Sequence, residues 1–449
     1  MASKEDPYER ASRRILSALL EAEAIELVTE RGLIGLARSL ATFLLRTETF
    51  EDRGTRVAEW LVEHVEVVDL WADDEQIEAL LARHWDVDDS PGESLGTKRA
   101  SPELEAALLE ARDDDDPCWL VYSDWLQSRG DLLGELGALQ AAMRTPDVAA
   151  SKRAQRRVAA FVRAHREALL GVAGEYHRIV RLEWGVGTLR AARISTTRYG
   201  DKQFHGAILL DALLERAVAR YLRELWLGPI DQKGSDQYGE MVAVLLRQSR
   251  PALRELAIGT ADLDGSTHGI VRNPGAMLGD LRMLEQRLPR LEALRLSGGN
   301  VELGALHSNR LQRLALRLRH ASEASLDAIG ASSLPSLREL CWGVLGAPRA
   351  VVPAFQALFD QLPALERLVV ERGGLEMLHG TCIFQPRARP PLRELVVLNT
   401  VIHDDARTHG VIAQLELERL ELRSCDVRLG AEGRRRIESR VGELVIEQA

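Results

Sequence analysis

LRELWL at residues 222–227 opens a series of eight six-residue segments that share the pattern L-x-x-L-x-(L/I/V/W). The others are LRELAI at 253, LEALRL at 291, LQRLAL at 311, LRELCW at 337, LERLVV at 365, LRELVV at 392 and LERLEL at 417. Successive segments start 31, 38, 20, 26, 28, 27 and 25 residues apart. Because side chains of a strand alternate between its faces, we expect the fourth and sixth residues to enter a shared core and the residues between them to face outward.

Apart from two longer intervals near its start, this series matches the period of 20–29 residues that is typical of leucine-rich repeats. Between the segments lie apolar runs long enough for short helices, such as the one around Leu326. We therefore predict an α/β fold in which residues 175–449 form an irregular leucine-rich-repeat solenoid, with a parallel concave sheet and convex helices. Residues 179–184 and 189–194 are expected to begin the sheet, and residues 444–446 to close it.

The outward-facing side chains of these predicted strands form the candidate partner-binding surface. They are acidic near the start of the series and basic in its middle, which suits a protein partner with complementary stripes of charge. Trp226 is the expected anchor, because an exposed tryptophan on a rigid strand is a typical binding hot spot. The alternative is a solvated sheet face that binds nothing. The candidate residues are Glu224, Trp226, Glu255, Arg295, Arg313, Arg317, Glu339, Arg367, Glu394, Arg419 and Glu421.

Residues 102–143, PELEAALLEARDDDDPCWLVYSDWLQSRGDLLGELGALQAAM, indicate two or three helices. The second begins at Pro117, since proline is favoured in the first turn of a helix. Its apolar residues lie close to one face: Leu120, Val121, Trp125 and Leu126. A further basic helix is expected at about 148–170, with Val158 and Phe161 on its apolar side. Together these helices predict a helical domain over residues 102–174.

This stretch resembles a short repeat-companion domain that precedes leucine-rich or other repeats in proteins of bacteria with large genomes. The matching residues are Asp116, Leu120-Val121-Tyr122, Asp124-Trp125-Leu126, Gly130-Asp131, Gly134-Glu135 and Leu139-Gln140. Ser123 stands where the family usually has alanine. The resemblance covers about 42 residues. It implies an intracellular bacterial protein and repeats downstream, but no activity, because none is established for the family.

Residues 1–85 are predicted to form a compact acidic bundle of four or five short helices. In size, helicity and position this region resembles the small death-like, effector-associated adaptor modules that precede repeats in bacterial signalling and conflict systems. Residues 86–101, DVDDSPGESLGTKRAS, are interpreted as a flexible linker because they combine proline, glycine, serine and charge. Within it, Lys98 and Arg99 form a candidate protease-sensitive site.

The net charge of −10 lies entirely in the first hundred residues, which hold 12 Lys+Arg against 22 Asp+Glu. The remaining 349 residues hold 46 of each sign. We therefore expect neither nucleic-acid nor membrane binding, since both favour a basic surface. No apolar run reaches the roughly 20 residues of a membrane span, and no secretion signal is recognised. Four widely spaced cysteines predict reduced thiols in a cytoplasmic protein.

The sequence lacks the common catalytic and nucleotide-binding motifs GxxxxGK[ST], GxGxxG after a strand, GxSxG and HExxH. The segment VIHDDARTHG at 401–410 could be read as a metal site, but polar loop residues are the favoured interpretation. Cys382, three residues from His379, is interpreted as a core cysteine and not as a nucleophile. The acidic run Asp113–Asp116 is interpreted as a helix cap and not as a cation site. No metal, cofactor or catalytic residue is therefore expected.

These observations predict a non-enzymatic bacterial adaptor or sensor of a signalling or defence system. Its repeats would bind one protein and its acidic N-terminal region would recruit another, with an oligomeric state that the sequence does not specify. One alternative is a substrate or inhibitor of a protease that cuts the 86–101 linker and releases the first region. Another is an enzyme with an unrecognised site in the convex-side loops, which would require a deep pocket lined by convergent titratable groups.

Overall fold

The computed structural model describes residues 101–449 except 114, 177–179, 196–205, 229–236, 260–275, 346–347, 372–390, 406–407, 410–411, 413–414, 416 and 448–449. Residues 101–449 form one compact unit. The bundle predicted at 1–85, the linker with Lys98 and Arg99, and the pair of Cys382 and His379 lie outside the described residues. Among the described helices, none is long and apolar enough to cross a membrane.

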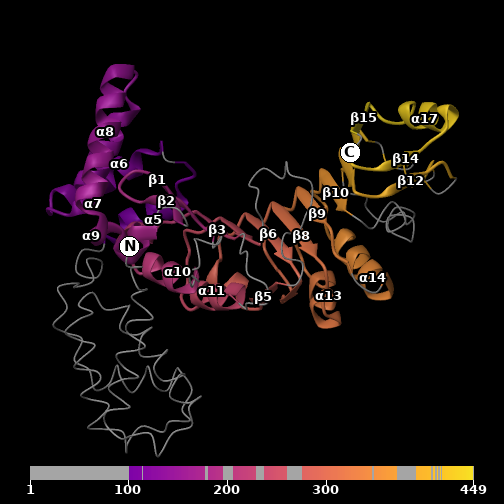
Figure 1. Cartoon of the computed structure of the whole chain (residues 1–449), viewed down its shortest axis with the longest axis horizontal. Coiled ribbons are helices and arrows are strands. Elements are labelled where there is room, and N and C mark those ends of the chain that lie inside the picture. The colour runs from indigo at the N-terminus through magenta and orange to yellow at the C-terminus, as the bar shows by residue number, and fades with distance from the viewer. Residues whose placement is uncertain are drawn as a thin grey trace, which may run out of the picture. The chain divides into compact units, whose positions relative to one another are not determined.

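The described part of residues 101–176 is helical, as predicted. It contains α5 (Pro102–Glu110), α6 (Pro117–Gln127), α7 (Leu132–Ala141), η3 (Ala142–Arg144), α8 (Val148–Ala164), α9 (Arg166–Leu170) and η4 (Gly171–Tyr176). The carboxylate of Asp116 accepts the N–H of Cys118 and thereby caps α6, as the sequence led us to expect. Asp131 caps α7 in the same way through the N–H of Leu133. In Figure 1, α8 projects beyond the other helices of this region.

The prediction for the apolar face of α6 is wrong in part. Leu120 and Val121 are 43% and 52% exposed. Trp119 and Tyr122 are buried in their place and meet Tyr221 edge to face, with ring centroids 5.9 and 5.7 Å away. The large aromatic rings bury more apolar area than the two aliphatic side chains, and they therefore set the orientation of the helix.

Eleven strands form one sheet in the order β1-β2-β3-β4-β6-β8-β9-β10-β11-β13-β15 (Figure 1). They are β1 (Val180–Trp184), β2 (Leu189–Ile194), β3 (Glu224–Leu227), β4 (Glu255–Ile258), β6 (Ala293–Gly298), β8 (Arg313–Leu318), β9 (Glu339–Trp342), β10 (Arg367–Glu371), β11 (Glu394–Leu398), β13 (Arg419–Arg423) and β15 (Glu443–Glu447). Only the pair β1–β2 in this sheet is antiparallel. All eight repeated segments supply strands of the sheet, and the predicted edge strands are β1, β2 and β15.

Helices cover one face of this sheet (Figure 1). Four of them are α10 (Gly206–Leu214), α11 (Gln237–Leu246), α13 (Glu323–Gly330) and α14 (Pro348–Phe359). Leu225 and Leu227 of β3 are almost completely buried and share one apolar cluster with helix residues such as Leu245 and Phe355. The fourth and sixth residues of this repeated segment therefore enter the core as predicted. On the other face, the two described apolar clusters contain strand residues only.

Several short elements were not anticipated from the sequence. β5 (Met277–Asp280) pairs with β7 (Asn300–Glu302), and β12 (Val401–His403) pairs with β14 (Asp426–Arg428), in two small parallel sheets. The remaining described elements are η5 (Ala217–Ala219), α12 (Leu284–Arg287) and α17 (Ala431–Glu438). Apart from α17, which has eight residues, these elements have three or four residues and are shorter than the window over which apolar periodicity is readable.

Arginines from successive repeats hold the C-terminal end of α5 against the sheet region. Arg223 donates to the carbonyls of Ala111 and Arg112 at 3.1 and 3.0 Å, and its guanidinium lies 4.9 Å from the ring centroid of Trp119. Arg254 donates to the carbonyl of Ala111 at 2.6 Å. These bonds satisfy carbonyls that no helical N–H can reach, and cations suit the negative end of the helix dipole. The same contacts fix the helical region to the sheet.

We predict that Arg223→Met lowers the free energy of unfolding by about 2–3 kcal/mol, because the carbonyls it serves lose a charged donor in a buried place. Arg223 is only 7% exposed, so water does not readily replace it. Urea-induced unfolding of the purified protein measures the effect. The control is Arg338→Met. Arg338 is exposed, and its nearest ion-pair distance, from Nη1 to Glu366 Oε1, is 3.8 Å, so its loss should cost little. Equal destabilisation by the two substitutions would contradict the proposed role of Arg223.

Candidate functional site

The sheet face opposite the helix layer, named the open face, consists of the strand residues that alternate with the buried leucines. In-register pairing aligns these side chains in rows that cross the strands. The charged row is Glu224, Glu255, Ala293, Arg313, Glu339, Arg367, Glu394, Arg419 and Glu443. The central row is Arg193, Trp226, Ala257, Arg295, Ala315, Cys341, Val369, Val396, Glu421 and Val445. A third row includes Ser297, Arg317, Glu371, Leu398, Arg423 and Glu447.

All eleven candidate residues lie in these rows, but two of them are not accessible. Trp226 and Glu421 are 7% and 1% exposed. The other nine are partly buried: Glu224, Glu255, Arg295, Arg313, Arg317, Glu339, Arg367, Glu394 and Arg419. The sequence pattern thus assigned each residue to the correct face of its strand, but it did not reveal how far neighbouring side chains would cover it.

The prediction that Trp226 is an exposed anchor is wrong. Trp226 packs with Ala191 and Ala257 in a small cluster on the open face. These alanines belong to the strands on either side, β2 and β4. A large indole beside small side chains can bury its area against them, which stabilises the sheet more than an exposed ring would. Trp226 is therefore part of the sheet's own packing.

The charged row satisfies much of its charge within the sheet. Arg367 lies between two glutamates of adjacent strands, 2.8 Å from Glu339 and 2.9 Å from Glu394. Arg313 forms an ion pair with Glu255. After the neutral Ala293, the sign of the row alternates from strand to strand between Arg313 and Glu443, so these neighbouring strands attract one another. The predicted order, acidic near the start and basic in the middle, concerned all rows together, in which Arg295 and Arg317 accompany Arg313; within this row alone the signs alternate.

Two buried carboxylates extend this pairing to the other rows. Glu421 lies between Arg419, with which it pairs, and Arg423, whose Nη2 is 2.8 Å from Glu421 Oε2. Glu371 is 4% exposed and forms an ion pair with Arg317, whose Nε lies 3.1 Å from Glu371 Oε2. Removing one partner of such a buried ion pair leaves the other charge uncompensated, which is strongly destabilising. Both residues are consequently structural elements of the open face.

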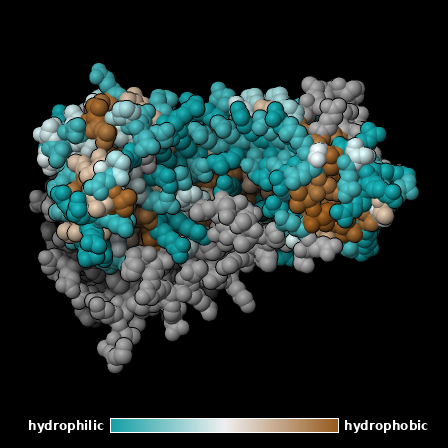
Figure 2. Space-filling view, turned by 90° about the horizontal axis from the view of Figure 1, so that it is seen from above, coloured by the Kyte–Doolittle hydropathy of each residue, from teal (hydrophilic) through white to brown (hydrophobic). Residues whose placement is uncertain are grey.

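The middle of the open face is apolar. Cys341, Val369 and Val396 occupy adjacent strands of the central row and form a cluster with Leu398, against which Ala315 packs. We name these five residues the apolar strip. Charged rows border it on both sides, and all of its members except Ala315 are buried, at 2–6% exposed. Most of the surface around the sheet is hydrophilic in the space-filling view, where hydrophobic side chains gather in a few places (Figure 2).

The cysteines of the described chain show no sign of nucleophilic activation. Cys118, Cys341 and Cys425 are free thiols. Burial raises the pKa of the Cys341 thiol, and the nearby Arg317 offsets this rise only in part. Burial and the adjacent Asp116 carboxylate raise the pKa of Cys118 to about 12. Because the thiolate is the reactive form, these thiols favour packing over catalysis.

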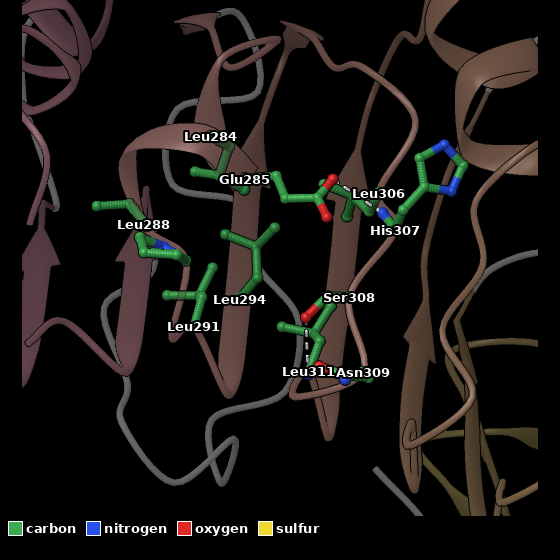
Figure 3. A pocket seen from close by; sticks show the side chains of 11 residues that line it. Leu284, Glu285, Leu288, Leu291, Leu294, Leu306, His307, Ser308, Asn309 and Leu311 are labelled. Carbon is green, nitrogen blue, oxygen red and sulfur yellow. Dashed lines mark hydrogen bonds between the residues drawn. The ribbon is translucent and has the colours of Figure 1, made fainter. Parts of the chain in front are cut away.

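A cavity of about 260 Å³ lies beside the shortest repeat, between Leu291 and Leu311. Only β7 lies between the main strands β6 and β8 in the chain, and α12, which precedes β6, contributes Leu284 and Glu285 to the lining. Six leucines line the cavity, and Glu285 and His307 are its titratable lining residues. In Figure 3 the Glu285 carboxylate points to the His307 backbone, whose N–H it accepts at 3.0 Å. The lining suits a small apolar group and lacks the converging titratable groups that an enzyme site requires.

The histidine and aspartate segment near residue 404 has a structural arrangement. His409 Nε2 lies 2.6 Å from Asp404 Oδ1, and Asp404 Oδ2 accepts the N–H of Gly430 at 2.9 Å, immediately before α17. His409 and this N–H lower the pKa of Asp404. Within the described residues, no three His, Cys, Asp or Glu side chains are grouped as metal ligands. The segment therefore fastens a loop to a helix.

Comparisons with known proteins give little further information. No family model and no curated protein matches the chain. Among solved structures, the chain is similar to a Bacteroides fragilis protein whose crystal structure was a structural-genomics target. The two are 14% identical, with a TM-score of 0.41, and the match covers 66% of this chain and 83% of the other. We draw no conclusion from a likeness of this size.

We predict that Glu421→Ala lowers the free energy of unfolding by about 2–3 kcal/mol, because Arg419 and Arg423 lose the carboxylate between them. Chemical denaturation at neutral pH measures the change. The matched control is Glu418→Ala, three residues away, where an exposed carboxylate lies 3.8 Å from Arg393. That substitution should cost less than about 0.5 kcal/mol. A loss at Glu421 as small as that of the control would refute the structural role of the pair.

A second prediction concerns Glu224. Burial raises the pKa of its carboxyl, and Glu255 on the next strand raises it further, while Arg190 opposes the rise. The folded state therefore favours protonated Glu224, and this stability is lost as the pH rises through the folded-state pKa. Glu224→Gln should be more stable than wild type at neutral pH, by less than about 1 kcal/mol since part of the charge stays hydrated. The difference in stability between Glu224→Gln and wild type should disappear at acidic pH, where Glu224 is protonated.

Thermal unfolding of wild type and Glu224→Gln between pH 4 and pH 8 tests this sign. Glu443→Gln, at the exposed far end of the same row, controls for the loss of a sheet carboxylate in general. A Glu224→Gln protein that is less stable than wild type at neutral pH would reverse our interpretation.

Proposed function

We propose that this chain is a leucine-rich-repeat protein without enzymatic activity that binds a protein partner through its open face. The supporting observation is that all eight repeated segments form in-register strands of one sheet. Helices pack on one face of this sheet, and the apolar clusters on its other face contain strand residues alone. In a leucine-rich-repeat solenoid the open face is the concave one and the helices are convex. Such a sheet is ordered before binding, so little conformational entropy is lost when a partner docks.

We place the centre of this contact at Ala315, the partly exposed residue of the apolar strip, and at the half-buried arginines beside it, Arg295, Arg313 and Arg317. The other four residues of the strip, Cys341, Val369, Val396 and Leu398, are 2–6% exposed and belong to the sheet's own packing. The bordering charges are already paired within the sheet, which reduces the cost of covering them. The partner should therefore present a small apolar side chain to Ala315, surrounded by neutral or paired polar groups.

The setting that we propose is a cytoplasmic bacterial signalling or defence system in which the chain is an adaptor or sensor. This part rests on the two sequence resemblances, of residues 102–143 to a repeat-companion domain and of residues 1–85 to effector-associated adaptor modules. In this proposal the open face binds one protein and residues 1–85 recruit a second.

Affinity capture from the native cell tests the open face. Ala315→Glu introduces a charge into the apolar strip, beside Arg295 on the neighbouring strand, where the sheet can accommodate it. We expect this substitution to reduce partner recovery by about tenfold or more, because a charge would be buried at the centre of the contact. The control is Ala324→Glu, an exposed position in the first turns of α13 on the helix layer.

Melting temperatures of both variants confirm that each is folded. A partner lost with Ala315→Glu and retained with Ala324→Glu supports binding at the open face. Equal recovery with both variants would show that the partner binds elsewhere, and no specific partner for the wild-type protein would refute the proposal.

A further inference from the structure

Helix α8, Val148–Ala164, carries five cations and no acidic residue in its 17 residues. The cations are Lys152, Arg153, Arg156, Arg157 and Arg163, and all five are exposed. At a rise of 1.5 Å per residue, they extend over about 16 Å of the helix.

The fold of α8 directs these cations to one side. Ala154 and Val158 are buried, and Phe161 and Val162 are half-buried, so these residues form the packed face. α8 contacts α7, η3 and α9. At 3.6 residues per turn, four of the exposed cations lie on the opposite side of the helix and Arg157 lies at the edge of the packed face. The exposed side also includes Ala159 and Ala160, whose small side chains allow another molecule to approach the helix closely.

The cations of α8 differ from the arginines of the sheet in having no acidic partner. In the described part of the chain, none of the five forms an ion pair, whereas Arg313, Arg367 and Arg419 each pair with glutamates. On α17 the exposed Arg434 pairs with Glu438 one turn away. Unpaired cations repel one another along a helix, so a row of them costs stability unless an anion compensates.

The chemistry of this side favours phosphates over a protein surface. Protein interfaces rely on aromatic and aliphatic side chains at their centres. On α8 the large apolar side chain that is well exposed is Val148, at the first position and before the cations. A phosphate backbone requires only positive charge, and arginine offers it a fork of paired donors. A helix fits the major groove of a B-form DNA duplex, where its flanks face the two phosphate strands, whereas on an RNA duplex it can only lie across the phosphates.

We propose that α8 binds the phosphate backbone of a nucleic-acid duplex without sequence preference, a function beyond protein binding at the open face. The expectation that the chain does not bind nucleic acid came from a charge that sums to zero after residue 100. The sum does not show where the charges are paired. Cations of the sheet form ion pairs with neighbouring glutamates, whereas those of α8 form none in the described part of the chain. Binding should be weak and steeply salt-dependent, with counterions released from the duplex.

Fluorescence anisotropy of labelled 20-base-pair DNA and RNA duplexes, titrated with the full chain at several salt concentrations, tests the proposal. The variant combines Arg153→Gln, Arg156→Gln and Arg157→Gln, which preserve helix propensity. We expect the slope of log affinity against log salt for DNA to become shallower by about 3 units, as for the loss of three phosphate contacts. The control combines Arg434→Gln, Arg435→Gln and Arg436→Gln on α17, where the same charge is removed and affinity should not change.

A labelled polyglutamate peptide is titrated in the same way, to test whether α8 prefers an acidic protein to a nucleic-acid duplex. Duplex binding that the α8 variant loses and the α17 variant retains supports the proposal, and the DNA and RNA arms identify the preferred duplex. Three results would overturn it: no duplex binding at low salt, equal loss with both variants, or tighter α8-dependent binding of polyglutamate. The last result would assign α8 to an acidic protein partner.

Discussion

The register between neighbouring parallel strands is the constraint on which the rest of this structure depends. Each repeated segment must place its fourth and sixth residues under the helix layer, and a slip of one residue would move those leucines to the opposite face. The register therefore also fixes which side chains stand next to one another on the open face, from Glu224 to Glu443 in one row. The composition of that face follows from the alignment of the core.

This alignment explains why the open face is neutral although it is rich in charge. Arg367 has a glutamate on each neighbouring strand, and Glu421 lies between two arginines of its own strand. These pairs make the strands attract one another where the helix layer cannot contribute. They also mean that the charges are largely satisfied before any partner arrives. In our proposal the specific contacts come from the half-buried side chains around Ala315, because the other residues of the apolar strip are only 2–6% exposed.

The order of the main strands could be predicted from the sequence because it depends on a local pattern repeated eight times. The burial of a single side chain could not be predicted from the sequence, because it depends on neighbours that are distant in the chain. Trp226 is buried because residues 191 and 257 are alanines, 35 positions before it and 31 after it. Tyr221 likewise orients α6 through Trp119 and Tyr122. Short elements such as β7 and β12 offered no readable periodicity.

Whether a charged surface recruits a partner depends on local pairing more than on the total charge. The arginines of the sheet and those of α8 contribute equally to the sum over the chain, yet their surroundings differ. Arg419 already interacts with a buried glutamate, so a new anion would compete with an existing bond. Arg156 and Arg157 extend from an exposed helix side without acids, where a polyanion would meet no competitor in the described chain. We therefore expect electrostatic attraction to act at α8, and shape and apolar contact to act at the open face.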